Sequence, residues 1–236
     1  RDKLVTGVQT CALPICLATE SSDPQLSIAD LAGRVTIDGS ALDVNLSRVR
    51  FPGTQFSARG NIRWPHDTVL WNLAMRADSA RLSDIRFLDS RFPEGAVLHG
   101  GVTVISRDGG RVLEIRLQPL DLTYGTGRLT GQITVFSAAD SGIVELRQGD
   151  LQARDLSLEF ARPFLDTLPF AGRLSGETRV DGPVGALKIE TAGSFRDSLV
   201  PDWPESQIHG KGEVNIAGSD LGFQPFGLET GRFDLA

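Results

Sequence analysis

The sequence predicts an all-β fold, in which a long, curved and mostly antiparallel sheet forms an open groove with the shape of a half-barrel. Three observations predict it. Apolar and polar residues alternate with a period of two over many short runs, as in half-buried strands. Clusters of Gly, Pro, Asp and Ser separate the runs, as in turns between successive strands. A glycine also recurs at one position of the runs, which indicates an internal repeat.

The alternation is clearest in residues 56–64 and 69–77. In the first run, Phe56, Ile62 and Trp64 share one face, while arginines and polar residues occupy the other. The second run has the same pattern. The same period of two recurs in residues 42–46, 113–117, 156–160, 187–190 and 213–216. Together these runs predict a sheet of about 12–16 short strands.

Few segments have helical periodicity. Residues 82–92 and 161–170 are the best candidates, and Pro163 and Pro169 limit the second. We therefore expect one or two short helices beside the sheet.

The repeat places a glycine between a small or apolar residue and a β-branched or aromatic one. It aligns residues 31–37, 58–64, 98–104, 129–135, 174–180 and 208–214. The shared glycines are Gly33, Gly60, Gly100, Gly131, Gly176 and Gly210. Residues two and four apart share a face, so these glycines are expected on the apolar face. A glycine weakens a strand, and we interpret the six as positions that relieve crowding where the sheet curves.

Residues 1–16 are set apart from the rest of the chain. The segment "VTGVQTCALPI" resembles the translation of a sequencing adapter, so we expect residues 1–16 to be a non-native scar. Both cysteines, Cys11 and Cys16, fall within it, and we expect neither a metal site nor a redox site there. Residues 17–236 are expected to form a single elongated β segment, truncated at both ends.

Composition argues against several classes of function. The net charge is −6, and acids and bases are interspersed without a basic stripe, so we expect no nucleic-acid partner. His66, His99 and His209 are far apart in the sequence and are expected to be solvated rather than metal ligands. No spacing of carboxylates or nucleophiles supports catalysis. The sequence therefore predicts neither an enzyme nor a bound metal or cofactor.

The apolar face of such a sheet needs a cover, because a face of this size is not left in water. A second sheet or closure into a barrel would give a dry core, and an open face would hold an apolar ligand instead. We expect these residues to line the face: Val35, Ile37, Val44, Phe56, Ile62, Trp64, Val69, Trp71, Leu73, Met75, Val102, Val104, Ile115, Ile133, Val135, Leu146, Leu158, Val180, Ile189, Val214 and Ile216.

Residues 172–195, "GRLSGETRVDGPVGALKIETAGSF", resemble the AsmA/TamB-like family of bacterial envelope proteins. Residues 98–104, 129–135 and 156–176 are also similar to its Gly-initiated strands. The resemblance implies a periplasmic segment that holds or conducts phospholipid acyl chains between the inner and outer membranes. It further implies an inner-membrane anchor in the missing N-terminal part, with phospholipid and an outer-membrane protein as partners. A structural or adhesive β-sandwich or solenoid domain with a dry core remains the alternative.

Overall fold

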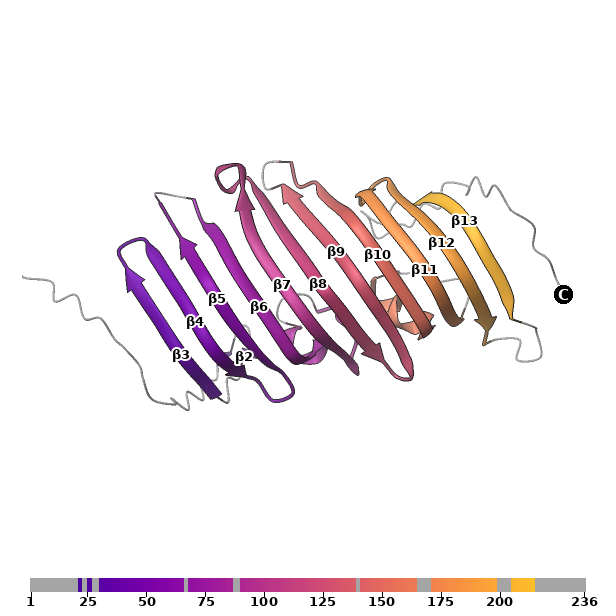
Figure 1. Ribbon diagram of the computed structural model, residues 1–236, viewed down its shortest axis with the longest axis horizontal. Helices are drawn as coiled ribbons and strands as arrows, with labels where there is room; N and C mark the ends of the chain where they lie inside the picture. The colour runs from indigo at the N-terminus through magenta and orange to yellow at the C-terminus, as the bar shows by residue number, and fades with distance from the viewer. Residues whose placement is uncertain are drawn as a thin grey trace, which may run out of the picture.

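The computed structural model describes residues 21–22, 25–26, 30–65, 68–86, 90–138, 141–164, 171–198 and 205–214. These residues form an open antiparallel sheet of 11 strands, in which every strand pairs with its neighbours in the sequence. Its two edge strands, β3 and β13, lie at opposite ends of the long axis (Figure 1). The prediction of an all-β, open and mostly antiparallel fold is confirmed.

The strands follow one another as a simple meander. The sheet contains β3 (Asp30–Asp38), β4 (Ala41–Arg50), β5 (Gln55–Arg63), β6 (Leu70–Arg81), β7 (Ala96–Arg107), β8 (Val112–Tyr124), β9 (Gly127–Ala138), β10 (Val144–Ser157), β11 (Gly172–Pro183), β12 (Leu187–Asp197) and β13 (Ser206–Val214). Two further strands, β1 (Ser21–Ser22) and β2 (Gln25–Leu26), pair with each other. Short 3-10 turns interrupt the connections, namely η1 (Leu82–Ile85), η2 (Asp108–Gly110), η3 (Leu158–Phe160) and η4 (Arg162–Phe164).

The described residues contain 11 strands in the sheet and two more in a separate pair, against the 12–16 expected for the whole chain. The structure corrects two other details of the sequence prediction. The expected helices contain only single 3-10 turns where they are described, η1 in 82–92 and η4 in 161–170. The predicted strand at 156–160 is wrong after Ser157, because the chain turns into η3 there and takes Leu158 out of the strand register.

One row of paired residues crosses the whole sheet and fixes its register. In order from β3 to β13, the row is Leu31, Val49, Phe56, Ala77, Gly100, Leu120, Gly131, Leu151, Thr178, Thr191 and Gly210. Directly paired residues project from the same face of a sheet, so this row lies on one face from edge to edge.

Bulges in the even-numbered strands keep that face apolar. In β4, Leu46 and Val49 are three residues apart, yet they pair with Ala58 and Phe56, which are two apart on β5. The extra residue of the bulge returns Val49 to the face of Leu46. Corresponding bulges lie between Ala77 and Ala80 of β6, Leu117 and Leu120 of β8, and Ala153 and Leu156 of β10.

The repeated glycines lie on the odd-numbered strands β3, β5, β7, β9, β11 and β13, so the repeat unit is one hairpin of two strands. Gly131 has φ 141°, a conformation that residues other than glycine rarely adopt. A Cβ on Gly131 would overlap the carbonyl oxygen of Asp150 on β10. A Cβ on Gly60, at φ 140°, would overlap the carbonyl oxygen of Asn72 on β6 in the same way. The same combination of positive φ and a neighbouring backbone oxygen occurs at Gly33, Gly100 and Gly176.

Five of the six repeated glycines therefore have a backbone reason, because each allows the next strand to approach closely: Gly33, Gly60, Gly100, Gly131 and Gly176. Relief of side-chain crowding, which we inferred from the sequence, is a different explanation. Their role in curving the sheet stays a prediction.

Replacing Gly131 by Ala is expected to lower the free energy of unfolding by about 2–4 kcal/mol, because strain at positive φ adds to an overlap with backbone. Gly142 is the matched control, since it lies in a turn at φ 65° with nothing within 4 Å of the position that a Cβ would take. Gly142→Ala should cost only about 1 kcal/mol. Urea unfolding measures both variants, and an equal loss in the two would contradict the close-approach explanation.

Candidate functional site

The candidate site is the face of the sheet that carries the apolar residues, called the apolar face below. Its central row runs through eight successive strands, β3 to β10. The row consists of Val35, Val44, Gly60, Leu73, Val104, Ile115, Val135 and Leu146. Seven of these eight residues were predicted to line the face, and the eighth is one of the repeated glycines. The structure brings them together as direct cross-strand pairs.

Two further rows flank the central one. One row lies nearer the end of the sheet that contains the β3–β4 turn. It pairs across β3 to β6 and consists of Ile37, Leu42, Ile62 and Trp71. On the other side lie Gly33, Leu46, Ala58, Met75, Val102, Leu117 and Ile133. Adjacent strands are about 4.8 Å apart, so the eleven strands give this face a width of about 50 Å.

The remaining predicted lining residues have varied positions. Val180 of β11 pairs with Ile189 of β12 on the same face. Trp64 and Val69 lie in the connection outside β5 and β6, and Leu158 lies in η3. Val214 pairs with Leu187 at the last described position, and Ile216 lies outside the described residues.

Several leucines of the face were missed in the sequence. They include Leu42, Leu46, Leu113, Leu117, Leu120, Leu122, Leu129 and Leu151. Leu113 and Leu117 belong to an alternating run together with Ile115, so the period of two could have identified them. Leu120 lies beyond the bulge of β8, where the spacing of three hides its face from a search for alternation.

Most side chains of the apolar face are half-buried. Among the described residues, no large side chain is buried to below 2% of its accessible surface. A tightly packed core usually contains such side chains. The apolar face therefore lacks a complete second layer within the described part of the chain.

Partial cover exists at one end of the strands. Ala80, Leu82, Ala96, Leu98, Leu120 and Leu122 form a buried cluster there. Ile85 and Phe92 of the β6–β7 connection and Phe160 of the β10–β11 connection pack against it. Figure 1 shows the corresponding helical turns near the lower ends of the strands. By residue number, the central row lies nearer the opposite ends of the strands.

The β6–β7 connection is fastened to the β4–β5 turn. A carboxylate oxygen of Asp84 accepts hydrogen bonds from the backbone N–H of Gly53, at 2.7 Å, and from the hydroxyl of Thr54, at 2.8 Å. The Thr54 oxygen accepts in turn from the N–H of Arg81, and Thr54 is only 3% exposed. These bonds hold η1 against the end of the sheet.

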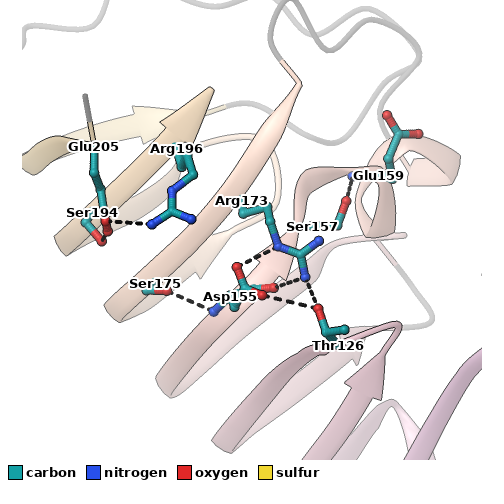
Figure 2. A network of polar contacts seen from close by, with 9 residues as sticks. All are labelled: Thr126, Asp155, Ser157, Glu159, Arg173, Ser175, Ser194, Arg196 and Glu205. Atoms are coloured by element: carbon teal, nitrogen blue, oxygen red, sulfur yellow. Dashed lines mark hydrogen bonds and ion pairs between the residues drawn. The ribbon is translucent and has the colours of Figure 1, made fainter. Parts of the chain in front are cut away.

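A second polar network joins the ends of β10 and β11 to the β8–β9 turn (Figure 2). Arg173 of β11 donates to a carboxylate oxygen of Asp155 at 2.6 Å and to its backbone oxygen at 2.8 Å. The hydroxyl of Thr126, in the β8–β9 turn, also contacts Asp155 and Arg173. The hydrogen bond from Arg173 does most to hold the pKa of Asp155 below its ordinary value; desolvation opposes it, and the hydrogen bond from Thr126 adds to it. This network supports the bulge of β10 immediately before η3.

The opposite face is polar and carries cross-strand ion pairs. Glu114 of β8 lies between Arg107 and Arg116, and its side chain is only 4% exposed. Burial alone would raise the pKa of Glu114, but the hydrogen bonds and charges of the two arginines hold it below its ordinary value. Arg147 pairs with Glu145 and lies 4.4 Å from the centre of the Phe136 ring.

A hollow of about 440 Å³ lies across β11, β12 and β13. It is lined by Arg179, Val180, Asp181, Lys188, Ile189, Glu190, Lys211, Gly212 and Glu213. Lys211 and Glu190 already form an ion pair within it, at 3.0 Å. The described residues contain no group of three or more His, Cys, Asp or Glu that could hold a metal ion. His99 and His209 are exposed, and His66 lies outside the described residues. In the part of the chain that the structure describes, no helix is long and apolar enough to span a membrane.

Replacing Glu114 by Gln is expected to lower the free energy of unfolding at pH 7 by about 1–3 kcal/mol, because the hydrogen bonds from Arg107 and Arg116 lose their negatively charged acceptor. The lowered pKa means that the carboxylate stabilises the fold above the unfolded value of about 4.3 and that this contribution is lost as the pH falls further. Glu145→Gln is the control, since its carboxylate is 29% exposed and should contribute less than about 1 kcal/mol. Urea unfolding at neutral and acidic pH measures both variants. Equal losses of unfolding free energy in the two variants at every pH would contradict this expectation.

Replacing Asp84 by Ala is expected to cost about 1–3 kcal/mol, because two donors lose their acceptor. Amide hydrogen exchange should accelerate in residues 51–54 and 82–86 before the rest of the sheet. Asp78→Ala is the matched control, since the exposed Asp78 carboxylate contacts only the Gln55 amide among its side-chain hydrogen bonds, at 3.4 Å. Uniform exchange in the Asp84 variant would show that the connection is not held by this contact.

Comparisons with known proteins found no relative of this chain. No family model matches the chain, and neither a curated protein nor a solved structure matches it.

Proposed function

We propose that this chain is a segment of a periplasm-spanning protein that holds phospholipid acyl chains along its apolar face and conducts them between the inner and outer membranes. The observation that carries the proposal is the row of apolar residues that passes through eight strands without a complete second layer. The resemblance of residues 172–195 to the AsmA/TamB-like family supports the same function.

The apolar face suits acyl chains because its chemistry is uniform. Val44, Leu73, Val104, Ile115 and Val135 present only branched aliphatic groups, one on each of five strands in the central row. Burial of each CH₂ group of a lipid is worth about 0.8 kcal/mol relative to water. Neighbouring positions differ little in affinity, so a chain can move from one strand to the next over low barriers.

The polar groups of the fold are arranged so that this face carries few of them. Charged residues such as Glu114 and Arg116 alternate with the apolar ones and project from the opposite face. A phospholipid would therefore lie with its acyl chains against the sheet and its headgroup in water at the margin. The proposed mechanism is passive, and the chain has no catalytic part in it.

A structural or adhesive domain with a dry core is the competing function. Such a core needs two packed layers, about 10 Å apart, with interdigitated side chains. The described residues supply one sheet plus two short connections, which cover one end of the strands only. This difference favours a face that accepts a ligand.

Photocrosslinking tests the proposal with pairs of neighbouring residues. A benzophenone amino acid at Val104 or Ile133 faces the apolar side, whereas one at Thr103 or Gln132 faces the polar side of the same strand. Incubation with a radiolabelled phospholipid, followed by illumination, should label the chain from Val104 and Ile133 and much less from Thr103 and Gln132.

Each pair of variants differs by one residue along the strand, so backbone environment and distance from the sheet edge are nearly matched. Equal labelling from both members of a pair, or no labelling from either, would contradict a lipid-holding role for the apolar face.

A further inference from the structure

The apolar face is open to water at one end of its strands. Four large apolar side chains of the described residues are exposed, namely Ile37 (70%), Val69 (46%), Trp71 (37%) and Ile143 (55%). They lie in or beside the β3–β4, β5–β6 and β9–β10 connections, which share one end of the sheet. This end is called the open end below.

The opposite end of the same strands is closed. On β3 to β10 and their connections, the described apolar residues that are buried all lie nearer the β4–β5, β6–β7 and β10–β11 connections, an end called the capped end below. They are Val49, Phe51, Ala58, Ala80, Leu82, Ala96, Leu98, Leu120, Leu122, Ala153 and Leu156. Phe160 of the β10–β11 connection packs there, with its ring edge-on to that of Tyr124 at 5.7 Å. The apolar face therefore has a direction along its strands.

The two ends also differ in polarity. At the open end, Ser106 of β7 and Ser137 of β9 pair with Leu113 of β8 from either side. The Ser106 hydroxyl accepts a hydrogen bond from the backbone N–H of Trp71 at 2.8 Å, and a serine hydroxyl can accept and donate at once. At the capped end, the side chains of the buried cluster and those packed against it are aliphatic or aromatic, and Tyr124 is the one among them with a hydroxyl. A polar group of a ligand therefore finds hydrogen-bond partners and water at the open end.

The distance between the two ends suits one layer of lipid. Ser106 and Leu98 are eight residues apart on β7, which corresponds to about 26 Å along the strand. The acyl chains of one leaflet occupy half of a hydrocarbon core of about 30 Å, so they extend over about 15 Å. One layer of acyl chains fits along the strands between the two ends, whereas two layers placed tail to tail do not.

We propose that phospholipid lies along strands β3 to β10 with its headgroup at the open end and the tips of its acyl chains against the capped end. The opposite direction would take a charged phosphate from water into an apolar cluster, which costs far more than apolar contact returns. This inference rests on the proposed function and deepens it, because it assigns the direction in which the lipid lies. Movement from strand to strand then keeps every headgroup at the same margin of the sheet.

Fluorescence quenching by nitroxide-labelled phosphatidylcholine tests this direction. Two single-tryptophan variants of the full chain are compared. The first keeps Trp71 at the open end, with Trp64 and Trp203 replaced by Phe. The second has all three tryptophans replaced by Phe and carries Leu129→Trp, since Leu129 packs against the cluster at the capped end. Each variant is loaded with lipid that carries the nitroxide either on the headgroup or near the tip of one acyl chain.

The headgroup label should quench Trp71 about two-fold more than the chain-tip label, and the order should reverse in the Leu129→Trp variant, because the two positions lie about 26 Å apart along the strands. Thr130→Trp is the matched control, since Thr130 is the next residue of β9 and pairs with Asp121 on the polar face, where neither label should quench. Leu151→Trp takes the place of Leu129→Trp if the latter does not fold, because Leu151 contacts the same cluster and lies opposite Gly131.

The outcomes separate the direction of the lipid from its presence. Equal quenching by the two labels, or the same order at both tryptophan positions, would overturn the proposed direction and leave lipid binding intact. Absence of quenching by either label at both positions would overturn the direction together with the proposed function on which it rests.

Discussion

The close approach of each glycine-bearing strand to the strand that follows it is the constraint on which the sheet depends. At Gly131, the backbone of β9 comes so near the Asp150 carbonyl that no side-chain carbon fits between them. The same contact recurs at alternate strands, and a bulge in the intervening strand accompanies it from β4 to β10. Glycine and bulge together set the register of one hairpin, and the hairpin repeats across the sheet.

The apolar face follows from this register. A slip of one residue at any strand would turn its apolar side chains toward the polar face, since side chains alternate along a strand. Because the bulges restore the alternation after every irregular position, residues from strands far apart in the sequence, such as Val35 and Leu146, belong to one continuous row. The polar contacts of Asp84 and Asp155 act at the other end of the strands. Asp84 holds the β6–β7 connection, which covers part of the face, and Asp155 joins β10 to β11.

Much of this organisation could be predicted from the sequence, for physical reasons that particular residues illustrate. Val102 and Val104 belong to uninterrupted alternation, so their shared face followed from the strand period. Leu120 and Leu158 show where the prediction fails, because a bulge precedes the first and a 3-10 turn contains the second. Pro119, inside β8, is a local signal for the bulge, because proline in a sheet is found at edges or bulges, whereas the turn at Leu158 has no comparable signal. The glycines were identified by their spacing, but their reason, a neighbouring carbonyl oxygen at positive φ, depends on a partner strand that the sequence alone does not place.

The proposed function requires that lipid occupy the apolar face of this chain, rather than a dry core closing it. Purification of the chain after expression in a bacterial periplasm, followed by solvent extraction and mass spectrometry, tests it directly. Phospholipid should copurify with the chain, and replacing Ile133 by Lys, which places a charge on the apolar face, should reduce the lipid recovered from folded protein. Folded chain that is free of lipid, with the same yield of extract from the wild type and the Lys variant, would contradict it.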